Sequence, residues 1–139
     1  MFVGTFEHSL DDKGRLVLPA TFRSALGERG FLSQYDRCLG LWTEEGFNDV
    51  AHRLREKVRD GSAAPNAVRS LTANASEVKL DSQGRITISP RLRDYADLTS
   101  NSVIIGAFDR IEIWDVARWE EVSADADDSL LVAVTSLGI

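Results

Sequence analysis

The feature that most constrains the fold of this chain is an internal repeat at an offset of 70 residues. Residues 10–18 read LDDKGRLVL and residues 80–88 read LDSQGRITI. The turn residues of one segment therefore align with the turn residues of the other, and the strand residues align likewise. After a slip of two residues, the segment LGLW at 39–42 falls on IEIW at 111–114. Chance similarity would not keep this order of turn, strand and terminal aromatic residue. Two copies of one small unit therefore organise the 139 residues.

The residue pattern of each copy predicts two strands joined by an Asp-x-x-Gly turn. Two more strands are expected after them. In the turns, Asp11 and Asp81 can hydrogen-bond their own backbone, and Gly14 and Gly84 supply the positive φ that a tight hairpin requires. The expected strands are residues 4–10, 15–18, 31–35, 38–42, 77–80, 85–88, 102–107 and 110–114. With short helices between them, the pattern predicts an α+β chain that is mainly β.

Two helices are expected in each copy. Pro19 and Pro90 mark the first turn of a short helix, because the fixed φ of proline suits that position. A longer helix closes each copy, with Thr43 and Asp115 as its N-caps. Residues 66–71 predict a further turn or two of helix between the copies.

The repeat divides the chain into four parts. The first copy occupies residues 1–60 and the second residues 73–122, with a link at 61–72. Residues 123–139 form an acidic tail that ends in the apolar run 130–134. This run either frays or docks on a neighbouring molecule.

The net charge of −6 argues at first against nucleic acid as a partner, because phosphate binding favours a basic surface. The charge is unevenly placed, however. Residues 1–110 carry fifteen basic and fifteen acidic side chains, whereas residues 111–139 carry one Arg and seven acids. A local basic face on the first part is therefore compatible with the composition. The basic stretch 53–59 is either a solvated helix face or a surface for DNA backbone or an acidic neighbour.

Several classes of protein are excluded or disfavoured. One cysteine cannot form an internal disulfide, and Cys38 with His8 and His52 cannot supply an ordinary zinc site. We expect Cys38 in the core, no metal or cofactor and no catalytic histidine. No apolar run approaches the roughly 18 residues that span a membrane. The sequence predicts a soluble, cytoplasmic protein without a targeting segment.

The arginine after each turn glycine needs its own explanation, because turn geometry does not require it. Arg15 and Arg85 each offer five donors in a planar fork that fits phosphate or the O6/N7 edge of guanine. The competing interpretation is structural, an ion pair from each arginine to Asp11 or Asp81. Both interpretations stay open at this point.

These motifs resemble the MraZ family of bacterial transcriptional regulators, which is related to AbrB-like DNA-binding domains. The resemblance covers residues 2–119 and rests on the duplicated Asp-x-x-Gly-Arg motifs, the opening HSLDDKGR at 8–15, LVLP at 16–19 followed by Phe22-Arg23, and the strand ends Trp42 and Trp114. It implies a swapped-hairpin (double-split) β-barrel made from two tandem repeats. It also implies a ring of about eight or more subunits, nucleoid association, and binding to repeated boxes upstream of the division and cell-wall gene cluster.

One position departs from the family pattern. Ser89 stands where the second copy usually has proline, and Pro90 follows it. We expect this change to alter the entry into the helix and to leave the turn intact.

The first hypothesis is a sequence-specific DNA-binding regulator, most simply a repressor. Arg15 and Arg85 would read bases, Lys13 would contact phosphate, and Arg23 and Arg93 would contribute from the helices that follow. The rival is a structural assembly protein whose hairpins meet partner subunits and never touch DNA. A small-molecule hydrolase is a distant third.

Overall fold

The order strand, strand, helix, strand, strand, helix occurs twice along the chain. The computed structural model describes residues 1–139. The first series comprises β1 (Phe2–Ser9), β2 (Arg15–Val17), α1 (Ala20–Leu26), β3 (Arg29–Gln34), β4 (Leu39–Trp42) and α2 (Glu44–Arg59). The second comprises β5 (Ser76–Lys79), β6 (Arg85–Thr87), α4 (Pro90–Ala96), β7 (Asn101–Phe108), β8 (Ile111–Asp115) and α5 (Val116–Val122). Two helices stand outside the series, α3 (Pro65–Ala73) and α6 (Ala126–Leu137).

The strands of the two series are interleaved. Six of them form one antiparallel sheet in the order β1-β7-β8-β4-β3-β5, and the remaining two form the separate pair β2-β6. Thus β1 pairs with β7 of the second series, and β5 pairs with β3 of the first. The fold is α+β with a mostly antiparallel sheet, as the sequence predicts.

The Asp-x-x-Gly turns close as predicted, but the expectation that each turn joins two strands paired as a hairpin needs correction. The strands that flank each turn form their ladders with strands of the other series and not with each other. The physical reason is the shared core: Leu16 of β2 and Ile86 of β6 point into one apolar cluster, together with Phe22 and Leu92 from α1 and α4. Burying a side chain of this size stabilises the fold by about 1.5–3 kcal/mol.

A smaller cluster lies where β7 and β8 meet α5. Cys38, Val103 and Trp114 are buried there, and Trp119 of α5 packs on Trp114 with ring centroids 5.5 Å apart. The expectation that Cys38 is a core residue is confirmed.

The predicted caps of the long helices are confirmed, and Pro90 is the first residue of α4, whereas Pro19 lies just before α1 as its N-cap and not in its first turn. The Thr43 hydroxyl accepts a hydrogen bond from the Gly46 N–H and caps α2, and the Asp115 carboxylate does the same for α5. Ser89 caps α4 by accepting from a backbone N–H, whereas Pro19, at the equivalent place before α1, offers no side-chain cap. The change from proline to serine therefore gives the second short helix a cap that the first lacks.

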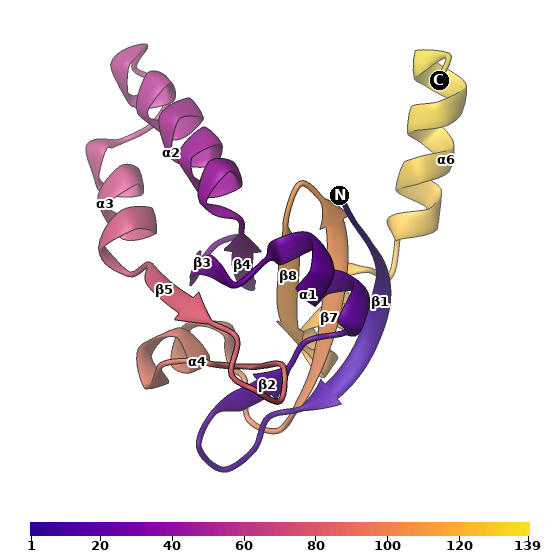
Figure 1. Ribbon diagram of the computed structural model, residues 1–139. Helices are drawn as coiled ribbons and strands as arrows, with labels where there is room; N and C mark the ends of the chain where they lie inside the picture. The colour runs from indigo at the N-terminus through magenta and orange to yellow at the C-terminus, as the bar shows by residue number, and fades with distance from the viewer.

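Three helices project from the sheet. In Figure 1, α2 and α3 stand on one side of the molecule and α6 on the other. The loops at residues 10–14 and 80–84 lie in the lower part of this view, away from α2 and α6. No helix is both long and apolar enough to span a lipid bilayer.

Candidate nucleic-acid interface

The β2–β6 ladder brings the two Asp-x-x-Gly-Arg motifs together. We refer to residues 11–15 as the first Gly-Arg turn and residues 81–85 as the second. Leu16 pairs with Ile86 at the centre of the ladder, and Arg15 and Arg85 lie one position away from this pair, on opposite strands.

Both arginines lie on the outward face of the ladder. Successive residues of a strand point to opposite faces, and Leu16 and Ile86 point into the core, so Arg15 and Arg85 point outward. They are diagonal neighbours, which places their backbones about 7–8 Å apart. The ladder continues beyond the strands, because each turn glycine accepts a hydrogen bond from the other repeat: Leu18 N–H to the Gly84 carbonyl and Ile88 N–H to the Gly14 carbonyl.

In the first turn, the Asp11 carboxylate organises the loop. Its Oδ1 accepts from the backbone N–H groups of Lys13 and Arg15 at 3.0 and 2.8 Å, and its Oδ2 accepts from Arg15 Nε at 2.6 Å. The Gly14 φ of +73° closes the loop in a conformation that side chains other than glycine rarely adopt. The predicted Asp turn is confirmed here.

The second turn repeats this geometry. Asp81 accepts from the backbone N–H groups of Gln83 and Arg85, both at 2.9 Å, and from Arg85 Nε at 2.8 Å. Gly84 has the same φ of +73°. The ion pairs that the structural interpretation requires are therefore present in both copies.

These ion pairs leave part of each guanidinium available. Only Nε of Arg15 and of Arg85 is hydrogen-bonded to its aspartate, and the Nη donors of both side chains make no hydrogen bond within the chain. The Nη edge is the part of arginine that grips phosphate or guanine in two-point contacts. The aspartates thus orient the arginines without consuming their binding groups.

Hydrogen bonding also fixes the charge of the turn aspartates. The Arg15 backbone N–H, helped by its guanidinium, lowers the pKa of Asp11 below the ordinary 3.8. Arg85 lowers the pKa of Asp81 in the same way. Both carboxylates are consequently ionised at neutral pH and hold their arginines in place.

Arg23 and Arg93 have a role that their place on helices did not reveal. Each is half-buried and lies across the turn glycine of the other repeat. A β-carbon on Gly84 would lie 2.4 Å from Arg23 Nη1, and one on Gly14 would lie 2.8 Å from Arg93 Cζ. Arg23 Nη1 also donates to the Leu18 carbonyl at 2.9 Å, whereas Arg93 Nε is buried without a hydrogen-bond partner. Both guanidinium groups therefore sit directly beneath the turns.

The remaining predicted contact, Lys13, is exposed at the tip of the first turn. The second turn has Gln83 at the equivalent position, so the two tips differ in charge. The segments that build this face, residues 11–23 and 79–93, carry a net charge of +4, although the whole chain carries −6. The face is thus locally positive.

The basic stretch of α2 lies elsewhere. Figure 1 shows α2 extending away from the two Gly-Arg turns. Its charges are partly engaged on the helix itself, with Arg53 paired to Asp49 and Arg59 paired to Glu56. The structure does not bring this stretch to the face that carries Arg15 and Arg85.

Comparisons of this chain with a family model and with individual proteins lead to the same family. A family model described as "MraZ protein, putative antitoxin-like" matches residues 1–66 and 71–135. A protein of Corynebacterium jeikeium named "Transcriptional regulator MraZ" is 46% identical, over 94% of this chain and 97% of its own length. Proteins of the same name from Nocardioides sp. and Acetivibrio thermocellus are 45% and 38% identical, over 90% and 100% of this chain and 88% and 100% of theirs. On these matches, which run through both repeats, the chain belongs to the MraZ family.

Proposed function

We propose that this chain is a DNA-binding transcriptional regulator that represses its target genes. The names of its relatives support regulation of transcription. The observation that carries DNA binding is the pairing of Arg15 and Arg85 on one outward face, each oriented by an aspartate and each with its Nη edge unused.

The two arginines are the proposed base readers. Nη atoms held on a projecting turn can reach the O6 and N7 atoms of guanine in the major groove. Lys13 at the tip supplies a phosphate contact, which positions the turn without reading sequence. Arg23 and Arg93, half-buried beneath the turns, act as positioning residues and add positive charge to the face.

We further propose the domain division 1–60, 61–72, 73–122 and 123–139, in which the two repeats close a swapped-hairpin β-barrel. The exchange of strands between repeats supports this division, because neither repeat has a sheet of its own. The acidic tail would lie away from DNA.

The proposed targets are repeated boxes upstream of the chain's own operon in the division and cell-wall gene cluster. A head-to-tail ring presents every protomer's turns in the same sense, which selects direct repeats, whereas a two-fold dimer selects inverted ones. One protomer offers only two reading turns, so several boxes engaged together gain affinity through effective concentration.

The test is a titration of the full chain against its own upstream DNA and against a scrambled fragment of equal length, at several salt concentrations. The proposal predicts tighter binding to the upstream fragment and an affinity that falls steeply with salt, because phosphate contacts release counterions. Equal affinity for both fragments would contradict sequence-specific reading. An assembled protein that binds neither fragment would instead favour the rival function, a structural assembly protein whose turns contact other subunits.

A further inference from the structure

The tips of the two Gly-Arg turns differ in chemistry, although their backbones are alike. Each turn closes with a hydrogen bond from the glycine N–H to the aspartate carbonyl, at 3.1 Å in the first turn and 3.0 Å in the second. The third residue of each turn lies at the tip, and this residue is Lys13 in the first turn and Gln83 in the second. Both residues are exposed. The two repeats therefore share a turn and present different side chains on it.

The backbone at Gln83 is fixed by the same carboxylate that holds Arg85. Asp81 Oδ1 accepts hydrogen bonds from the backbone N–H groups of both residues, each at 2.9 Å. The side-chain amide of Gln83, in contrast, makes no hydrogen bond within the chain. This amide is therefore available to a ligand, and the point from which it projects is set relative to Arg85.

The second turn is also the better supported of the two. Arg23, which lies beneath Gly84, donates through Nη1 to the Leu18 carbonyl at 2.9 Å. Arg93, which lies beneath the first turn, has its buried Nε without a hydrogen-bond partner. A neutral amide must be placed accurately to bond a base edge, whereas a lysine acts as a point charge on a flexible stem. The turn with the firmer support thus carries the side chain that needs accurate placement.

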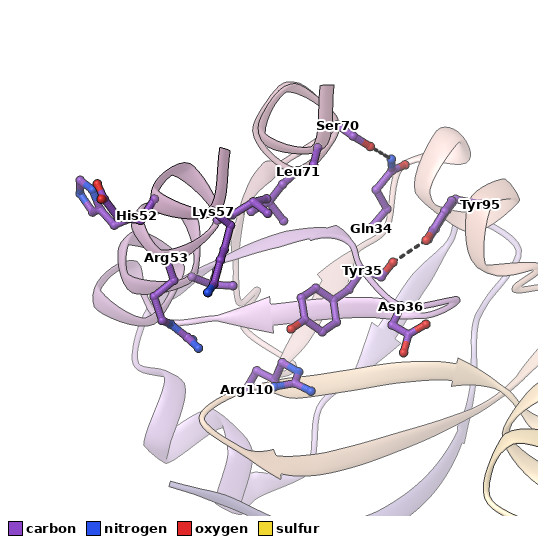
Figure 2. A pocket seen from close by; sticks show the side chains of 14 residues that line it. Gln34, Tyr35, Asp36, His52, Arg53, Lys57, Ser70, Leu71, Tyr95 and Arg110 are labelled. Atoms are coloured by element: carbon purple, nitrogen blue, oxygen red, sulfur yellow. Dashed lines mark hydrogen bonds between the residues drawn. The ribbon is translucent and has the colours of Figure 1, made fainter. Parts of the chain in front are cut away.

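The chain has one other glutamine, and its amide is already engaged. Gln34, in the wall of the groove beside α2 and α3, donates through this amide to the Ser70 hydroxyl, and Figure 2 shows the bond. Gln34 therefore bonds within the fold, whereas Gln83 does not. This contrast makes Gln34 the matched control for changes at Gln83.

The donors and acceptors of the amide indicate which ligand suits Gln83. A glutamine amide offers an acceptor oxygen and two donors, whereas the lysine ammonium offers three donors and no acceptor. A DNA phosphate only accepts, so contact with it would leave the amide oxygen without a donor. In the major groove, adenine presents the acceptor N7 beside the donor N6 amino group, and a glutamine amide matches both atoms at once.

The place of Gln83 on the turn determines which base pair it can reach. Leu16 and Ile86 pair at the centre of the β2–β6 ladder, and Arg85 comes next along the chain toward the tip. Gln83 lies two residues farther from this centre. When Arg85 contacts a guanine, Gln83 is therefore placed toward the base pair on the outer side of that guanine.

We propose that Gln83 reads an adenine next to the guanine that Arg85 contacts, on the side away from the Leu16–Ile86 pair. The first turn lacks this contact, because Lys13 cannot accept a hydrogen bond from the adenine amino group. Each protomer thus distinguishes the two ends of its box, although the antiparallel ladder relates its two reading arginines by an approximate two-fold axis. This inference rests on the proposed DNA-binding function and adds a specificity-determining residue to it.

The first test measures base preference by competition titrations with the full chain. The probes are duplexes of its own upstream DNA in which each base pair of one box is changed in turn. In the wild type, changing the adenine should lower the affinity roughly five- to 150-fold, as expected for one two-point base contact. In Gln83→Ala, that position should become insensitive while the guanine positions keep their effect. Gln34→Ala should keep the wild-type profile.

The second test addresses the contacted atom. Replacing the adenine with 7-deazaadenine removes the N7 acceptor and keeps the Watson–Crick pair. This probe should bind the wild type more weakly than the natural duplex does, and it should bind Gln83→Ala as well as the natural duplex does. The exchange variant K13Q/Q83K keeps the composition and net charge of the chain, and it should move the adenine preference to the other end of the box.

Three results would overturn the reading of adenine by Gln83. The first is a Gln83→Ala profile identical to that of the wild type. The second is a uniform loss of affinity for every probe in this variant, which would indicate a phosphate contact. The third is an adenine preference that stays at its original end in K13Q/Q83K.

The failure of this inference differs from the failure of the proposed function. A wild type that binds the upstream and scrambled fragments alike would remove both the function and the adenine contact. A sequence-specific wild type whose base profile survives Gln83→Ala would remove only the adenine contact and keep the function.

Discussion

Arg23 lies across Gly84 so closely that a β-carbon on this glycine would sit 2.4 Å from Arg23 Nη1. The partner relationship, Arg93 across Gly14, repeats the contact in the other direction. Each short helix therefore supports the turn of the other repeat. The two turns depend on each other for their position.

This contact predicts how much stability is lost when the turn glycine Gly84 is replaced. Gly84→Ala should lower the free energy of unfolding by about 1–2 kcal/mol for the positive φ, and by a further 0.5–1.5 kcal/mol or so if Arg23 loses its bond to Leu18. Gly61→Ala is the matched control, because Gly61 has a φ of +85° and a β-carbon added to it would meet nothing within 4 Å. Denaturant unfolding of both variants measures the difference. Equal losses would show that the Arg23 contact contributes nothing.

The turn aspartates predict a pH dependence of stability. A lowered pKa in the folded state means that ionised Asp11 and Asp81 stabilise the fold above their ordinary pKa of 3.8, and that this stabilisation is lost as the pH falls through the lower folded value. The variant D11N/D81N should be less stable than the wild type at pH 7, and the gap should shrink as the pH falls below the ordinary carboxyl pKa of 3.8. Asp12→Asn, a change at an exposed neighbour outside these hydrogen bonds, should leave the profile unchanged. Denaturant unfolding across this pH range provides the measurement, and a constant gap would contradict the assignment.

Burial predicts an unreactive thiol. Burial raises the pKa of Cys38 to about 12, so the reactive thiolate is scarce at pH 8 and the sulfur is covered. A chromogenic disulfide reagent should react with Cys38 slowly in the native protein and rapidly once denaturant is added. Rapid reaction under native conditions would show that the cluster around Trp114 opens readily.

The proposed ring on direct repeats predicts a strict spacing of boxes. Successive protomers must meet the same face of the duplex, so boxes should recur at about one helical turn, roughly 10–10.5 base pairs. Moving one box by about five base pairs turns it to the far side and should remove most of the affinity gained from several boxes. A shift of one full turn is the control. Affinity that is insensitive to the half-turn shift would argue against this arrangement.

The sequence predicts local structure well because local structure depends on neighbouring residues. Asp11 and Gly14 dictate their turn, and Thr43 and Asp115 begin their helices, whatever the rest of the chain does. The Arg15 Nε bond to Asp11 also follows from the turn, because the turn brings the two side chains together.

Pairing between the repeats could not be predicted in this way. No residue within the strands themselves says that β1 joins β7 or that β5 joins β3, because the paired residues lie 92–106 and 44–50 positions apart along the chain. The supporting role of Arg23 and Arg93 depends on that exchange, which carries each helix over the other turn. The one available signal is that both arginines recur at the repeat offset of 70 residues beside buried Phe22 and Leu92.

An equilibrium titration of DNA affinity tests most directly whether Arg15 and Arg85 read bases. Wild type, Arg15→Ala, Arg85→Ala and the double variant would be titrated against the upstream repeats and a scrambled fragment at one salt concentration. Arg69→Ala, a change at an exposed arginine on α3, is the matched control.

Each reading contact should be worth about 1–3 kcal/mol of specific binding, so each single variant should lose affinity for the repeats and the double variant should bind both fragments alike. Folding should persist, because the lost ion pairs are solvent-accessible and pairs of this kind add little to stability. Wild-type discrimination between the two fragments in a folded, assembled R15A/R85A protein would contradict the account.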